Sequence, residues 1–319
     1  MNVKIEVLSN NTTDLTLQTD PIFKGKVIQP TKRVVAAIAE HGLAMGIETN
    51  GMKILYDFGG MGFAILKNLE IFNINPEIFQ KAVLSHGHFD HFGSLVKLIP
   101  QLGPGKEIIV SPDIYKQKIS YLPGESGDLE ILKENYRALK KKGKVRELPR
   151  IKKAFLDKLT AENQQTLIET SKPVELAPGV WTSGEIEIFD ENELTSNMFL
   201  KIDKTTFERE TFRDEIAIYI NVEDKGLIVL TGCGHTGIIN TIKHGQKISG
   251  VKKIYAVIGG FHLNYAPEKQ LDRVVNYFNE ISPEIICGMH CTGFKFNSKL
   301  LAKMPENATL GVVGTDFIL

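Results

Sequence analysis

The stretch that most constrains the fold is a cluster of ionisable side chains just after a short apolar run. In the run Lys81-Ala82-Val83-Leu84 the last three residues are apolar, which is typical of the end of a buried strand. Four candidate metal ligands follow within a span of six residues, namely His86, His88, Asp90 and His91. Because side chains at i and i+2 of an extended backbone point the same way, the first two can bind one cation and the last two can face a second. The cluster favours a metal site over a polar loop with hydrogen-bonded histidines.

Three later glycine-rich turns also carry histidine or cysteine where an apolar segment ends. They hold Cys233, His235, His262 and His290. Side chains converge where the strands of a sheet end, so we expect these groups to meet the first cluster. Cys233 and His290 are candidate metal ligands, since thiolate and imidazole both bind zinc, and the resemblance described below implies that role for both. The alternative for Cys233 is a small buried cysteine.

The remaining candidates are assigned supporting or catalytic roles. His235 lies near a predicted helix N-terminus and can bind a metal or an anion. His262 is expected to line the pocket as a hydrogen-bond donor or general acid, and Asp90 to act in catalysis as well as bind metal. Asp57 ends a strand and can brace the metal loop from the second shell of the site, or can be an ordinary turn aspartate. His41, beside a turn glycine, is more typical of a structural histidine.

The motif His86-x-His88-x-Asp90-His91 after a strand resembles the signature of the metallo-β-lactamase superfamily. Further motifs resemble one branch, the dihydropterin-ribofuranosyl-aminobenzene phosphate synthase-like proteins. These motifs are Glu40-His41-Gly42-Leu43-Ala44, Ile54-Leu55-Tyr56-Asp57-Phe58-Gly59, Thr231-Gly232-Cys233-Gly234-His235, Gly259-Gly260-Phe261-His262-Leu263 and His290-Cys291-Thr292-Gly293. The resemblance implies an α/β fold, the metallo-β-lactamase αββα sandwich, in which two mixed β-sheets are flanked by helices. It also implies the bracing role for Asp57.

The chain departs from the superfamily pattern at two positions. The pattern has an aspartate where this sequence has Cys233, and a thiolate there shifts the metal preference toward zinc. The pattern also takes a ligand to the first metal from a histidine between the first cluster and that turn, but the sequence has none between residues 92 and 232. Asp214, Glu215 or His235 could replace it. The resemblance implies one or two divalent ions, zinc first, with manganese or iron as alternatives.

We expect a single domain over residues 1–319 with an insertion at about 112–170. The dipeptide Asn50-Gly51 between two strand-like runs predicts a tight hairpin in the N-terminal part. From Lys133 to Lys158 the sequence has eleven Lys or Arg against three Asp or Glu. Loosely periodic apolar residues in the insertion predict helices over the mouth of the site. Their basic surface can attract anionic substrates or can be an ordinary solvated surface.

Composition limits the kinds of partner. The formal net charge is zero, so no global field favours nucleic acid or an anionic membrane. No apolar run reaches the length of a transmembrane helix, and the first residues do not have the pattern of a signal peptide. The three cysteines are odd in number and lie among candidate site residues. A reduced cytoplasmic enzyme is therefore favoured over a disulfide between Cys287 and Cys291.

The resemblance implies a metal-dependent hydrolase in which hydroxide on the metal attacks an ester or phosphoester bond. The expected substrate is a small anionic molecule, pterin-like or ribose-phosphate-like. Two alternatives stay open. One is a phosphodiesterase or ribonuclease of the same fold, although the sequence has no aromatic-rich basic platform for a nucleic acid. The other is a metal-binding redox or sensing module, which the soft Cys233 and the missing histidine favour.

Overall fold

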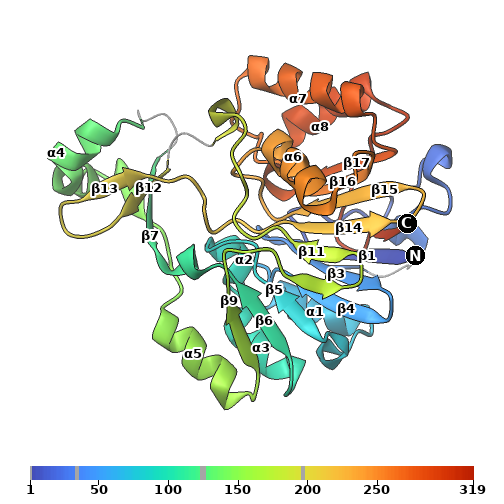
Figure 1. Ribbon diagram of the computed structural model, residues 1–319, viewed down its shortest axis with the longest axis horizontal. Coiled ribbons are helices and arrows are strands. Elements are labelled where there is room, and N and C mark those ends of the chain that lie inside the picture. The colour runs from blue at the N-terminus through green and yellow to red at the C-terminus, as the bar shows by residue number, and fades with distance from the viewer. Residues whose placement is uncertain (1, 33–35, 123–126, 195–197) are drawn as a thin grey trace.

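Two β-sheets lie face to face at the centre of the molecule, and helices cover the outer face of each (Figure 1). The computed structural model describes residues 2–32, 36–122, 127–194 and 198–319. Its four layers are those of an αββα sandwich with mixed sheets, so the fold class expected from the sequence is confirmed.

The first sheet contains eight of the described strands, in the order β2-β18-β1-β3-β4-β5-β6-β9. In that order they span Val27–Ile28, Asp316–Ile318, Val3–Ser9, Ala44–Thr49, Met52–Tyr56, Lys81–Val83, Glu107–Val110 and Thr166–Glu169. Strands β4, β5, β6 and β9 run parallel to one another. The other neighbouring strands of this sheet pair antiparallel. The first and last strands of the chain, β1 and β18, therefore lie next to each other in one sheet.

Strands β3 and β4 form the tight hairpin that Asn50-Gly51 predicts. Thr49 pairs with Met52 across the turn, and the two turn residues have φ of 49° and 75°. A two-residue turn with both φ angles positive matches the right-handed twist of the strands it joins. The hairpin prediction is confirmed.

The second sheet contains six of the described strands, in the order β10-β11-β14-β15-β16-β17. They span Glu175–Ala177, Val180–Thr182, Ile218–Val222, Gly226–Thr231, Ile254–Gly260 and Ile285–Met289. Strands β15, β16 and β17 are parallel neighbours. Each connection between them returns through a helix, first α6 (Ile238–Ser249) and then α7 (Glu268–Ile281), so all three carboxyl ends lie at one edge of the sheet.

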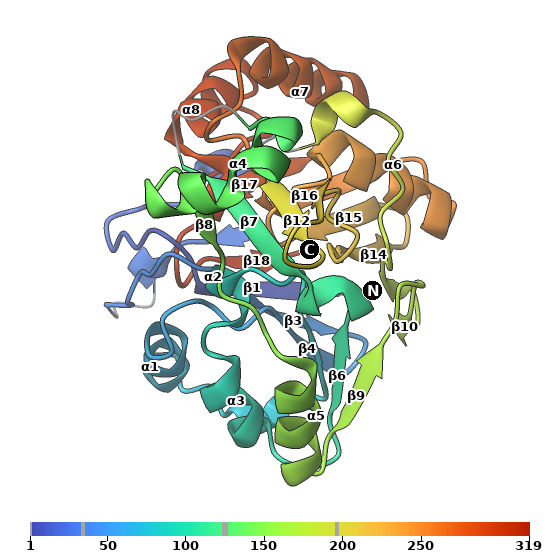
Figure 2. The same cartoon turned by 90° about the vertical axis from the view of Figure 1, so that its left-hand side faces the viewer.

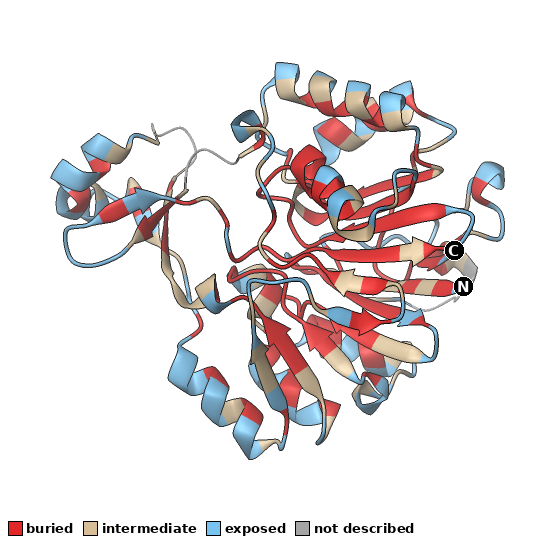
Figure 3. Ribbon diagram, viewed as in Figure 1, coloured by how far each residue is buried: buried red, intermediate tan, exposed pale blue. Residues whose placement is uncertain are grey.

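Apolar side chains from both sheets fill the space between them. Ile5 of the first sheet and Ile258 of the second are both fully buried in this central core. Strands β15 and β16 are buried at every residue because the core covers one face and α6, α7 and α8 (Phe294–Lys303) cover the other. The helices on the outer face of the first sheet are α1 (Ala64–Ile71), α3 (Leu95–Leu102) and α5 (Lys153–Glu162). Figure 3 shows the buried strands between helices whose outer faces are exposed. In the described part of the chain, no helix combines the length and apolar character needed to cross a membrane.

A smaller lobe stands beside the sandwich (Figure 1), and Figure 2 views the molecule from its side. It contains a sheet in the order β13-β12-β7-β8 and the helix α4. These elements span Phe207–Arg209, Met198–Lys201, Gln117–Tyr121, Val145–Glu147 and Leu129–Lys141. The sequence predicted a helical insertion at about 112–170, but the structure has β7, β8 and β9 there as well as α4 and α5. Because β7 pairs with β12 from outside the segment, local periodicity could not indicate this sheet.

Candidate metal centre

The candidate ligands lie where strands of both sheets end. In the first sheet, β5 leads into His86 and His88, and the short helix α2 (Phe89–Phe92) carries Asp90 and His91. In the second sheet, the turns after β15, β16 and β17 carry Cys233, His235, His262 and His290. Residues that are far apart in the sequence therefore meet at one place, as the sequence analysis expected.

The first group of ligands consists of three buried histidines, His86, His88 and His235, with one ligand atom of each within 4.8 Å of the others. His88 Nδ1 lies 3.0 Å from His86 Nε2 and 3.1 Å from His235 Nε2. Burial, together with nearby positive charge, lowers the pKa of all three imidazoles well below its usual value. The rings are therefore neutral at physiological pH and offer lone pairs.

The surroundings of this group fit a divalent metal ion. The three nitrogen atoms that face one another are His86 Nε2, His88 Nδ1 and His235 Nε2, and all three residues are buried. A cation between these three nitrogens would be coordinated by all of them at once. Neutral imidazole nitrogens are among the commonest zinc ligands in proteins.

The second group combines oxygen, nitrogen and sulfur donors from Asp90, His91, Cys233 and His290. His91 Nε2 lies 3.1 Å from Cys233 Sγ and 3.2 Å from His290 Nε2, and Asp90 Oδ2 lies 3.2 Å from His290 Nε2. Although burial alone would raise the pKa of Asp90, hydrogen bonds from His290 and His41 hold it well below its usual range. Burial raises the pKa of the Cys233 thiol, so the thiol would lose its proton only as it bound a metal.

His235 is the third histidine of the first group. Its ring stacks on Phe212, with 4.2 Å between centroids and 4° between planes, and the ring of His262 lies 4.0 Å away. Glu215 accepts hydrogen bonds from the backbone N–H groups of His235 and Thr236, both at 2.7 Å. With His235 oriented in this way, the first group has three histidines, which is the number of protein ligands common in catalytic zinc sites.

Asp214, which the sequence suggested as a possible metal or anion ligand, belongs to neither group. Its carboxylate accepts a hydrogen bond from the backbone N–H of Gly87 at 2.8 Å and pairs with Lys118 of β7. Both charged side chains are buried. Because an ammonium group and an N–H already satisfy the carboxylate, Asp214 holds the loop of His86 and His88 in place and lies outside both groups. Glu215, the other substitute considered, is likewise occupied by backbone N–H groups.

Glu210, which lies 4.0 Å from Lys118, gives this junction a pH dependence. Burial outweighs the nearby ammonium group and raises the pKa of Glu210 to about 7 from 4.5. Between these two pH values the folded protein keeps a proton that the unfolded chain has released, so the free energy of unfolding falls as pH rises through this window.

We expect Glu210→Gln, which cannot titrate, to gain stability relative to the wild type across the same pH window, by up to roughly 3 kcal/mol. Urea unfolding at pH 4.5 and 7.5 measures the difference. Glu208→Gln, an exposed change two residues earlier in β13, is the control. A Glu210→Gln effect that is equal at both pH values would contradict the assignment.

Asp57 braces the metal loop. Its carboxylate accepts hydrogen bonds from the backbone N–H and the hydroxyl of Ser85, both at 2.7 Å, and lies 2.6 Å from His91 Nδ1. Burial alone would lower the pKa of His91, but the Asp57 carboxylate raises it to about 9. The contact fixes the His91 ring so that Nε2 points at Cys233 and His290. Between the two roles considered from the sequence, the geometry favours the bracing one over an ordinary turn aspartate.

Asp57→Asn is expected to weaken metal binding by about 10- to 100-fold, because the orientation and basicity of His91 depend on the carboxylate. Competition with a chromophoric chelator measures the affinity. Asp224→Asn is a matched control, since Asp224 also has a positive φ, 62° against 66° for Asp57, but lies exposed in a turn. Equal affinities in the two variants would show that Asp57 has no bracing role.

Two residues beside the ligand groups were not predicted as site residues. The side chain of His41 is 71% exposed, and its Nε2 lies 3.3 Å from Asp90 Oδ2. The hydrogen bond with Asp90 raises the pKa of His41. Cys291 Sγ donates to the carbonyl oxygen of Cys233 at 3.3 Å. Both residues lie in motifs that resemble the family. Membership in those motifs was the sequence signal that could have identified them as site residues.

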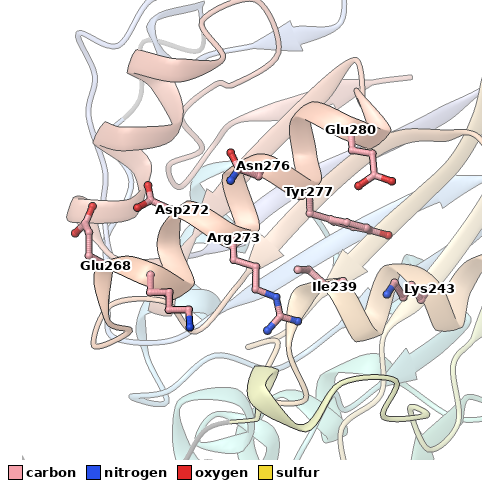
Figure 4. Close-up of a pocket in the computed structure, with 9 residues that line it drawn as sticks. Ile239, Lys243, Glu268, Asp272, Arg273, Asn276, Tyr277 and Glu280 are labelled. Atoms are coloured by element: carbon pink, nitrogen blue, oxygen red, sulfur yellow. The ribbon is translucent and has the colours of Figure 1, made fainter.

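A separate groove of about 750 Å³ lies between α6 and α7 (Figure 4). Charged side chains line most of it, including Lys243 and Arg273. Arg273 pairs with Asp190 and lies 3.6 Å from Glu193, so its charge is already compensated. The residues that line the groove include no member of either ligand group. The candidate active site is the metal centre, away from this groove.

Comparison with known proteins places this arrangement in a family. A solved metal-dependent hydrolase of the β-lactamase superfamily has the same fold, with a TM-score of 0.72, 20% sequence identity and coverage of 99% of both chains. The 7,8-dihydropterin-6-methyl-4-(beta-D-ribofuranosyl)-aminobenzene-5'-phosphate synthase of Methanocaldococcus jannaschii is 32% identical over 280 residues, which cover 84% of this chain and 86% of that protein. The chain belongs to this synthase's branch of the metallo-β-lactamase superfamily.

Other members of the superfamily extend the comparison. An uncharacterized protein of the same archaeon is 31% identical over 276 residues, which cover 86% of this chain and 92% of that protein. The metallo-β-lactamase fold protein YhfI from Bacillus subtilis has a TM-score of 0.52 at 12% identity, with 100% of this chain and 99% of that chain covered. No family model matches the chain. The family membership therefore rests on the relatives, and the fold on the structures.

Proposed function

We propose that the protein is a metal-dependent hydrolase that breaks an ester or phosphoester bond of a small anionic molecule. The observation that carries this proposal is the pair of adjacent ligand groups, one of three neutral histidines and one that includes a carboxylate and a thiol. His86, His88 and His235 would hold one divalent ion, and Asp90, His91, Cys233 and His290 a second. Bound ions of this kind supply Lewis acidity and activate water at neutral pH.

The side chains around the two groups have complementary roles in such a reaction. Asp90 stays ionised beside His290 in the second group, so it can accept a hydrogen bond from the attacking water and orient it. His41 reaches Asp90 from the solvent side and can bind an anionic group of the substrate. Burial alone would lower the pKa of His262, but the neighbouring Cys291 raises it, so His262 can hold a proton and donate it to the leaving group.

The proposed substrate class has support from the family and from the charge distribution. The name of the 32% identical relative describes a product with a dihydropterin ring and a 5'-phosphate. Several lysines of the basic insertion pair with nearby carboxylates, among them Lys140 with Glu147 at 3.1 Å and Lys133 with Glu130 at 2.7 Å. Locally paired charges do not favour a long polyanion, so we propose a small molecule over a nucleic acid.

A second candidate function is a synthase reaction, and the name of the same relative favours it. It would use the same two metal groups but join two substrates, so the two candidates differ in what the loaded protein does with a single substrate. We keep hydrolysis as the leading proposal because activation of water is the chemistry that the ligand groups support most directly.

A substrate panel tests the proposal. Protein loaded in turn with zinc, manganese and iron would be assayed on phosphomonoesters, phosphodiesters and lactones, and on a dihydropterin mixed with a ribofuranosyl-aminobenzene phosphate. The His88→Ala variant purified in the same way controls for contaminating phosphatases. Metal-dependent turnover of a single substrate supports hydrolysis, and product only from the mixture supports the synthase. No turnover of any of them by the loaded protein would overturn the proposal.

A further inference from the structure

A third group of metal-binding side chains lies beside the first two. It consists of Cys233, His262 and Cys291, with one ligand atom of each within 4.8 Å of the others. The residues come from the ends of three neighbouring strands, β15, β16 and β17. A Cβ at Gly260 of β16 would lie only 2.9 Å from Cys291 Sγ and 3.0 Å from Cys233 Cα, so the two cysteines come together across a residue with no side chain.

Hydrogen bonds hold the turn that carries His262 against the turn that carries Cys291. The backbone N–H of Phe261 donates to Thr292 Oγ1 at 2.9 Å, and that of Asn264 donates to the carbonyl oxygen of Cys291 at 3.3 Å. His262 itself has φ of 48°, a left-handed conformation that is uncommon outside glycine. Its Nδ1 is buried and has no hydrogen-bond partner in the described part of the chain. One ring nitrogen of His262 also lies within 4.8 Å of both thiol sulfurs, close enough for the side chain to interact with Cys291.

We propose that Cys233, His262 and Cys291 form a third metal position, which takes a thiophilic divalent ion such as zinc. The position goes beyond the proposed function, which places ions only in the first two groups. An imidazole that binds an ion through one ring nitrogen keeps its proton on the other, so His262 could still donate a proton. Cys233 would bridge between this ion and the Asp90–His91–His290 ion through its thiolate. On binding, the Cys233 and Cys291 thiols each release one proton to water, and the two thiolates balance the charge of one dication.

The donor set separates this position from its neighbours. Two sulfurs and one nitrogen are softer than three imidazoles, and softer than a set with one carboxylate. Two cysteines and one histidine with a fourth place open is also a ligand set found in catalytic zinc sites. The position would therefore fill with zinc, cadmium or cobalt in preference to magnesium or manganese, and its ion would keep one coordination place free.

Cobalt(II) is a suitable probe, because thiolate ligands give it absorption in the near ultraviolet. Reduced wild-type protein, Cys291→Ala and Cys291→Ser would be saturated with cobalt without oxygen, and bound metal would be counted by elemental analysis. We expect both variants to hold one ion fewer per chain and to lose about two thirds of the thiolate absorption, since only one of the sulfur–metal bonds, that of Cys233 to the second ion, remains. His262→Ala should also hold one ion fewer but keep some of that absorption.

Cys287→Ala is the matched control, since Cys287 is a buried cysteine in the core between the sheets. It should match the wild type in ion count and in absorption. The same ion count and absorption in wild type and Cys291→Ala would overturn the proposal. Loss of hydrolysis plays no part in these readouts, so the third position and the proposed function fail separately.

Discussion

Replacement of His88 by alanine is expected to reduce hydrolytic turnover by about 10³-fold or more while the fold is kept. His88 lies at the centre of the first ligand group, within 3.0 Å of His86 and 3.1 Å of His235. Without it, two imidazoles remain, and they cannot fix an ion in one position as three do. The residue lies in the turn after β5 and contributes no apolar surface to the core, so the sandwich should survive.

The measurement is initial rate on the best substrate of the panel, together with far-ultraviolet circular dichroism at low temperature. His290→Ala removes a ligand of the second group and is expected to give the same result. His244→Ala is the control, because His244 is also buried but bonds the carbonyl oxygen of Ser183, outside the ligand groups. Turnover within tenfold of the wild type would contradict a catalytic metal, and collapse of the dichroism would favour a structural one.

Removal of the metal is expected to abolish turnover and to lower the melting temperature. We expect the purified protein to carry at least one zinc, manganese or iron ion per chain. An ion present at 1,000 times its dissociation constant stabilises the folded state by about 4 kcal/mol. For a domain of this size the loss corresponds to a fall in melting temperature of roughly 10 °C. Dialysis against a chelator, followed by calorimetry and elemental analysis, measures both effects.

Restoration with one metal at a time identifies the ion that supports turnover. The His88→Ala protein provides the control, since it should show a smaller fall in melting temperature on chelation than the wild type. Dialysed protein that contains no metal but keeps its turnover and melting temperature would show that the ligand groups have another purpose. Wild-type protein that takes up no metal even after supplementation would remove the basis of the proposed function.

Local sequence signals were sufficient for the elements around the site. The run from Lys81 to His91 predicted a strand that ends in ligands because a buried strand, a polar turn and closely spaced histidines are all local features. The hairpin at Asn50-Gly51 followed from the backbone preferences of two residues. The fold class came from the motifs as a set, and the layers observed agree with it.

What could not be predicted depends on contacts between distant parts of the chain. The sequence left open whether His235 or Asp214 completes the first group. In the structure, Asp214 forms an ion pair with Lys118, which lies 96 positions earlier in the sequence, and this pairing could not be predicted from local sequence. The small sheet was missed since β7 finds its partner beyond α5. His41 was placed among structural histidines because its sequence neighbours do not show that Asp90 lies beside it.

The second ligand group joins residues from the N-terminal and C-terminal parts of the chain. His91 and Cys233 are 142 positions apart in the sequence, and His91 and His290 are 199 positions apart. An ion held between them would close loops of that length, as a disulfide does, without any oxidation of the cysteines. The entropy cost of closing a loop grows only with the logarithm of its length, so closing these long loops costs only slightly more than closing short ones. A metal ion there would serve as a reversible cross-link that ties the first sheet of the sandwich to the second.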